Sequence, residues 1–150
     1  MNTIVVENIV KQTIRTRTIK KTIGGVGVAG CDFNFATATN QTEQVINLGA
    51  IIPAGAKIVD CHIRTDAAFT GAVSLATEMG TTSSGHELLG STDIIAKDTF
   101  LRPADFAHQF VGPAATATSI YVASTPGANW SLAVLGKMSV YITYTDVTDL

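Results

Sequence analysis

Alternation between apolar and polar residues is the dominant pattern along this chain. It runs through residues 59–64, 72–79 and 138–145. A β-strand places successive side chains on opposite faces, so each segment predicts a strand that is buried on one face and exposed on the other. The side chains expected to be buried are Val59, Cys61 and Ile63, then Val73, Leu75, Thr77 and Met79, then Met138, Val140, Ile142 and Tyr144.

Shorter or weaker patterns predict three further strands. Val45–Leu48 and Ile120–Ser124 are short runs of the same kind. Thr13–Ile19 also alternates, but both of its parities are largely polar. A strand without an apolar face contributes little to a core, so this segment predicts an edge strand or an arm.

Turn signals separate the strands. Pro53-Ala54-Gly55 and Thr125-Pro126-Gly127 predict tight turns, because proline fixes φ at the second position and glycine tolerates a positive φ. Gly80–Gly85 predicts a polar loop, and Ser91–Lys97 predicts one or two helical turns that begin at a Ser or Thr cap. Short strands at such intervals indicate an all-β fold, a β-sandwich or jelly-roll-like domain.

Composition agrees with one packed domain that makes contacts. The chain has 150 residues, 46% hydrophobic and 15% charged, against about 25% charged in an average soluble domain. So few charges indicate an exterior that is bland or covered by partners. The N-terminus has no apolar signal core, and no apolar run approaches the ~20 residues of a membrane span, so we expect cytoplasmic synthesis and no membrane association.

The two cysteines are too few for a disulfide framework. Cys61 falls on the apolar parity of its predicted strand, so we expect a buried thiol that behaves as a small hydrophobic group. We expect no bridge between Cys31 and Cys61, because nothing in the sequence indicates an oxidising compartment.

Charge is divided unevenly along the chain. The first 21 positions hold five basic residues and one acid, a net charge of +4, and the rest holds five basic and eleven acidic residues, a net charge of −6. A basic arm of this kind binds an acidic protein surface or nucleic acid, or is simply a solvated strand face. Nucleic acid is disfavoured because no aromatic residues are interleaved with the basic ones. The candidate partner-binding residues are Lys11, Arg15, Arg17, Lys20 and Lys21.

This division suggests a domain organisation. Residues 1–23 form an N-terminal arm or edge strand, residues 24–30 (GGVGVAG) a glycine-rich linker, and residues 31–150 the β-sandwich domain. Gly25–Gly30 also matches the G-x-G-x-x-G pattern of dinucleotide sites. However, no helical pattern follows it and no acid lies about twenty residues further on, so we interpret it as a linker.

No catalytic, cofactor or metal site emerges from the motifs. His62, His86 and His108 lack zinc-ligand spacing, and a loop site formed by His86, Glu87 and Asp93 is only a weak alternative. No G-x-S-x-G nucleophile motif occurs. His62 falls on the exposed parity, which indicates a surface or interface residue. We therefore expect a protein that is not an enzyme and has no cofactor.

Trp130 has two interpretations. Near a loop, an exposed Trp stacks on sugars, as in carbohydrate-binding sandwiches; otherwise it opens the C-terminal strands and fills the core. The second interpretation is favoured, and a carbohydrate-binding β-sandwich stays as the alternative from another functional class.

Two segments resemble a known group of proteins. They are Asn47–Asp60 (NLGAIIPAGAKIVD), continuing through Arg64 to Phe69, and the ending Gly136–Thr145 (GKMSVYITYT). The resemblance spans about residues 44–146 and is to small virion proteins from the structural gene blocks of tailed bacteriophages. It rests on the order of strands and turns, and it brings no functional residues with it.

The resemblance implies a β-sandwich that decorates or cements a capsid, often as a homo-oligomer. The expected function is therefore that of a capsid decoration or auxiliary capsid protein. It would be made in the cytoplasm of a bacterial host and reside in the virion. Its expected partners are the major capsid protein or other virion proteins. A tail or head–tail connector component is the alternative within the virion.

Overall fold

Eight β-strands form the computed structural model of this chain, which describes residues 12–24, 41–71, 73–102, 114–130 and 136–149. No α-helix lies within these ranges, and the predicted all-β class is confirmed. In chain order the strands are β1 Gln12–Gly24, β2 Gln44–Asn47, β3 Lys57–Ala67, β4 Leu75–Gly80, β5 Leu89–Asp93, β6 Phe100–Leu101, β7 Tyr121–Pro126 and β8 Lys137–Asp149.

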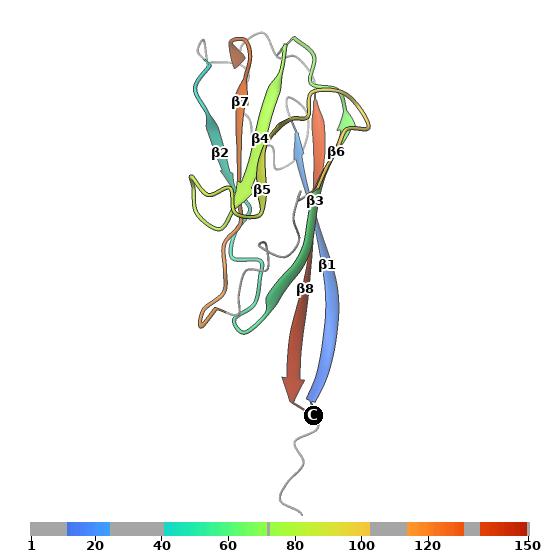
Figure 1. Cartoon of the computed structure of the whole chain (residues 1–150), viewed down its shortest axis with the longest axis vertical. Helices are drawn as coiled ribbons and strands as arrows, with labels where there is room; N and C mark the ends of the chain where they lie inside the picture. Colours follow the sequence, from blue (N-terminus) through green and yellow to red (C-terminus); the bar gives the residue numbers. More distant parts are fainter. Residues whose placement is uncertain (1–11, 25–40, 72, 103–113, 131–135, 150) are drawn as a thin grey trace, which may run out of the picture.

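The strands form two four-stranded antiparallel sheets. The first sheet has the order β1-β8-β3-β6, and the second has the order β2-β7-β4-β5. The two sheets form two layers (Figure 1). Buried side chains from both sheets belong to one hydrophobic cluster. Two sheets that enclose a common core in this way form a β-sandwich.

The inner faces of the sheets follow the predicted alternation closely. Met138, Val140, Ile142 and Tyr144 of β8 are all buried, as are Leu75, Thr77 and Met79 of β4. Trp130 is also fully buried in the core, which confirms the favoured interpretation of this residue. Four described hydroxyl residues are fully buried (Thr65, Thr77, Ser124 and Ser139), and the hydroxyls of Thr77 and Ser124 form a hydrogen bond of 2.8 Å with each other. These two buried hydroxyls therefore satisfy each other.

Strand β3 is tied to the second sheet on both sides of β5. The Thr65 hydroxyl donates a hydrogen bond of 2.6 Å to the carbonyl of Ile94, and the Cys61 thiol lies 3.6 Å from the carbonyl of Leu88. Burial, with a smaller contribution from the charge of Asp60, raises the pKa of Cys61 to about 12. The expectation of a buried thiol at Cys61 is confirmed, whereas Cys31 lies outside the described residues.

A β-bulge corrects the prediction for Val59. Ile58 lies opposite Tyr144 and Asp60 lies opposite Thr143, so Val59 is the extra residue in β3. A bulge shifts the side-chain parity of the strand at that point. As a result Ile58 is buried in the core, while Val59 is only half-buried.

Three local predictions also need correction. Val73, expected to be buried, is 77% exposed and has a positive φ of 66°, because β4 begins only at Leu75. Ser91–Lys97, expected to form helical turns, instead contributes to β5, which pairs with β4. Thr125 and Pro126 continue β7 rather than forming a turn. The turn at Pro53 is confirmed, because Ala56 donates a backbone hydrogen bond to Pro53 and Gly55 has a φ of 80°.

Strand β1 is an edge strand of the first sheet, one of the two forms predicted for this segment. It pairs with β8 along its whole length, from Gln12 opposite Asp149 to Gly24 opposite Lys137. Beyond the end of β3 at Lys57, the two strands continue as a ribbon away from the second sheet (Figure 1). The isoleucine at the other end of β1, Ile23, belongs to the core. The end of the predicted arm nearest the linker therefore contributes to packing.

Candidate interaction surface

The basic residues predicted to bind a partner lie on both faces of β1. Arg15, Arg17 and Lys21 share the parity of the core residue Ile23, whereas Lys20 lies on the opposite, outer face. All four basic side chains are exposed, and Lys11 lies outside the described residues. The sequence groups these cations, but the pleat of the strand separates Lys20 from the others.

The outer face of the first sheet carries a row of side chains that begins at Lys20. Cross-strand register places Lys20 of β1 beside Tyr141 of β8, and Tyr141 beside His62 of β3. The imidazole of His62 stacks on the Tyr141 ring, with centroids 4.5 Å apart and planes at 16°. On its β6 side, His62 lies 4.6 Å from the ring of Phe100.

A cation lies over the ring at each end of this row. The Lys20 ammonium is 5.6 Å from the centroid of Tyr141, and the Arg102 guanidinium is 4.8 Å from the centroid of Phe100. Both distances fall within the ~6 Å range of cation–π attraction. We call Lys20, Tyr141, His62, Phe100 and Arg102 the aromatic row.

The environment of His62 favours the neutral form of its imidazole. Burial lowers the pKa of His62, the charge of Asp60 opposes this effect, and the nearby Arg102 lowers the pKa further. Asp60 itself has a buried Oδ1 that accepts no hydrogen bond from the described residues. A neutral imidazole can stack between two rings without carrying a charge into the row.

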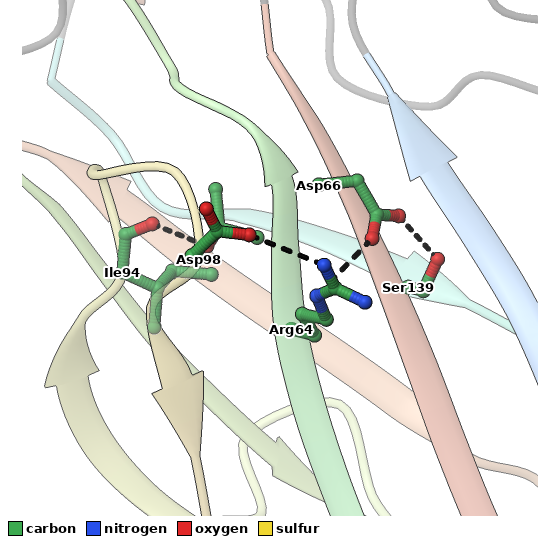
Figure 2. Close-up of polar contacts among 6 residues, drawn as sticks. Arg64, Asp66, Ile94, Asp98 and Ser139 are labelled. Carbon is green, nitrogen blue, oxygen red and sulfur yellow. Dashed lines mark hydrogen bonds and ion pairs between the residues drawn. The ribbon is translucent and has the colours of Figure 1, made fainter.

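An ion-pair network lies beside the aromatic row on the same sheet. Figure 2 shows Arg64 between two carboxylates, with its guanidinium 3.1 Å from Asp98 and 3.9 Å from Asp66. Asp66 also accepts a hydrogen bond from the Ser139 hydroxyl. Arg64 is half exposed, and pairs with this exposure contribute at most about 1 kcal/mol to stability. The network therefore fixes side-chain positions more than it stabilises the fold.

The weak metal-site alternative receives no support. Glu87 accepts hydrogen bonds from the backbone and hydroxyl of Thr81, and Asp93 accepts them from the backbone of Leu75 and Ile95. Burial raises the pKa of Glu87, but the hydrogen bonds from Thr81 and from its own backbone, together with the charge of His86, outweigh it, so the pKa lies below the ordinary value. Among the described residues, no three His, Cys, Asp or Glu side chains are grouped as metal ligands would be.

Trp130 offers no surface for stacking on sugars. Its ring is fully buried, and its indole N–H donates a hydrogen bond of 2.7 Å to the carbonyl of Thr42. This geometry removes the residue on which the carbohydrate-binding alternative mainly rested.

In the part of the chain that the structure covers, no helix is long and apolar enough to span a membrane.

The aromatic row could not be predicted from the sequence, because its members are far apart in the chain. Only the strand order β1-β8-β3-β6 brings them together. A signal was nevertheless present: His62 and Tyr141 each place a large ring on the polar, outward parity of a predicted strand. His62 was accordingly expected at the surface or in an interface, and it lies on the outer face.

Comparisons with known proteins place the fold. No protein-family model and no curated protein matches this chain. The fold is similar to a chain of the capsid asymmetric unit of cyanophage Pam1, with a TM-score of 0.53 and 11% identity over 97% of this chain and 92% of that chain. It is also similar to a chain of the acidic stable capsid structure of Helicobacter pylori bacteriophage KHP30, with a TM-score of 0.50 and 13% identity over 93% and 98% of the two chains. The chain therefore shares its fold with components of two phage capsids.

Proposed function

We propose that this chain is a non-enzymatic structural protein of a tailed bacteriophage virion. Within the virion, we propose that it is a capsid decoration or auxiliary capsid protein that binds the head shell and stabilises it. The observation that carries the proposal is the shared fold, which extends along nearly the full length of this chain and of both capsid chains. Because the shared fold covers 97% and 93% of this chain, the similarity extends over the whole chain and is not limited to one segment.

The surface of the molecule supports a role in contacts. Strand-rich sandwiches present broad, rigid faces, and only 15% of the residues in this chain are charged. Partner surfaces are depleted of charge at their centres, so a bland exterior suits repeated protein contacts. We propose as partners the major capsid protein, other virion proteins and further copies of this chain. The exposed cations of β1, with Lys11 before it, would contribute to these contacts.

The experiment that tests this function uses a phage that lacks the gene. If the chain is a decoration protein, shells should still assemble without it but should withstand less heat. Purified protein added to these shells should bind them and restore their resistance to heat. Cryo-electron microscopy of wild-type particles should place the chain on the outside of the head.

Other results would assign a different role. If no shells assemble without the chain, it is a building block of the shell itself. Density confined to the neck or the tail would identify a connector or tail component. If the chain is absent from purified particles, the virion role is wrong.

A further inference from the structure

The rings of the aromatic row have their faces occupied by neighbouring side chains. Tyr141 lies between Lys20 on β1 and His62 on β3, and His62 lies between Tyr141 on β8 and Phe100 on β6. The side chains that stack on bases or sugars need a free ring face. Because the neighbours occupy these faces, the row presents a ridge rather than a stacking platform.

The ridge remains partly open to solvent. Phe100 is 46% exposed, and Tyr141 and His62 are half-buried although they lie on the outer face. Aromatic and Arg side chains are enriched in protein interfaces, where they form the few contacts that dominate binding. The ridge therefore offers apolar area and ordered side chains that lose little freedom when a partner covers them.

The two cations of the row have no carboxylate partner among the described residues. The ion pairs in this part of the chain join Arg64 to Asp66 and to Asp98, and neither Lys20 nor Arg102 takes part. Each cation is instead held over a ring. A partner with carboxylates on either side of an apolar strip would complement both the charge and the shape of this ridge.

We propose that the aromatic row is the surface with which this chain docks on a capsid-shell protein that offers an apolar strip flanked by carboxylates. The inference rests on the proposed function and adds the face, the anchoring residues and the chemistry of the partner. Phe100 and Tyr141 supply the apolar contact, and Lys20 and Arg102 supply the charge complementarity. The neutral His62 holds the two rings apart and in order.

The test measures binding to shells purified from a phage that lacks the gene. Phe100→Ala should weaken binding about tenfold, the usual effect of losing an aromatic anchor. The double variant Lys20→Gln and Arg102→Gln should lose about tenfold at low salt and less at high salt, because exposed charges are screened within ~10 Å at 0.1 M. Lys97→Gln combined with Lys137→Gln is the matched control, since both lysines are exposed and lie outside the row. This control should bind like the wild type.

The possible outcomes distinguish a wrong docking face from a wrong function. If the wild-type protein does not bind shells, the decoration function fails and the inference fails with it. If the wild type binds and both row variants bind equally well, the function stands and the docking face is wrong. An effect of the control equal to that of the row double variant would show that net charge, rather than the row, matters. Binding of a single-stranded oligonucleotide that Phe100→Ala abolishes, with shell binding unchanged, would assign the row to nucleic acid instead. Melting temperatures of all variants should stay close to that of the wild type.

Discussion

The two faces of the first sheet differ sharply although they share the same strands. On β1, Ile23 on the inner face is fully buried, whereas Ile14, on the outer face in the ribbon beyond β3, is 69% exposed. On β3, Cys61 points into the core beside Leu88, while the next residue, His62, stacks between two rings on the outside. Within the sandwich the inner face meets the second sheet, whereas no sheet formed by the described residues covers the outer face. The buried side chains of the inner face therefore stabilise the fold, and the ordered, accessible side chains of the outer face are available for contacts.

The largest expected effect comes from truncating the two isoleucines of β1. Ile23→Ala should lower the free energy of unfolding by about 2–5 kcal/mol, because it removes buried methyl groups and leaves a cavity. Ile14→Ala, on the same strand, should change it by less than about 0.5 kcal/mol. Urea unfolding measures both variants. Similar losses would show that the outer face is also covered in solution, for example by another copy.

A buried hydroxyl provides a second, smaller test of the inner face. Thr65→Val should cost about 1–3 kcal/mol, because the carbonyl of Ile94 loses the hydrogen bond that it accepts from Thr65 and stays buried. Thr143→Val on the outer face is the control, because its partner Thr18 is exposed and can form a hydrogen bond with water instead. Thermal unfolding of the two variants should rank them in this order. A neutral Thr65→Val would mean that this contact between β3 and the second sheet does not stabilise the sandwich.

The pH dependence of stability tests the outer face. Burial lowers the pKa of His62 in the folded protein below its ordinary value of 6.5, so the unfolded chain binds this proton first as the pH falls. Stability from the neutral imidazole is therefore present above the unfolded pKa and declines as the pH drops toward the folded pKa. Between about pH 7 and pH 5, the wild type should lose more stability than His62→Gln. Parallel losses would mean that His62 titrates as it does in the unfolded chain.

The smallest effect is expected for a hydrogen bond across the outer face. The hydroxyls of Thr18 and Thr143 lie 2.9 Å apart on paired positions of β1 and β8. A double-mutant cycle with valine at each position should give a coupling of about 0.2–1 kcal/mol, the usual range for exposed cross-strand pairs. A coupling well above this range would make the outer face a source of stability and would weaken the division between the two faces.

Local patterns in the sequence predicted most strands correctly, because alternation depends only on neighbouring residues. Residues 138–144 show this well: Met138, Val140, Ile142 and Tyr144 are buried as expected, although Ser139, on the outward parity, is buried too. The bulge at Val59 could not be predicted, since it depends on how β3 meets β8. Strand β6 has only two residues, which is too short for any period to appear.

The candidate surface depended on long-range order that the sequence does not display. Lys20 was among the basic residues singled out, but its neighbours Tyr141 and Phe100 lie far along the chain and meet it only through the strand order. In the sequence, no aromatic residues are interleaved with the basic residues of the first 21 positions, which disfavours nucleic acid as a partner. In the folded chain aromatics do lie next to Lys20 and Arg102, and it is the occupied ring faces that now count against base stacking. The division of the chain at residues 24–30 stays a prediction, and residues 25–30 lie outside the described part.

The paired strands β1 and β8 should resist a pulling force differently depending on the direction of that force. Each strand has thirteen residues, and they stay in register from end to end. A force that draws Gln12 and Lys137 apart acts along the strands, so all the cross-strand hydrogen bonds share it at once. A force that separates Gln12 from Asp149 opens the ribbon from its free end and breaks one pair after another. We expect single-molecule pulling between the first two positions to require clearly more force than pulling between the second two. A partner that grips the ribbon would therefore be held firmly under tension along the strands and would be released easily by a sideways pull.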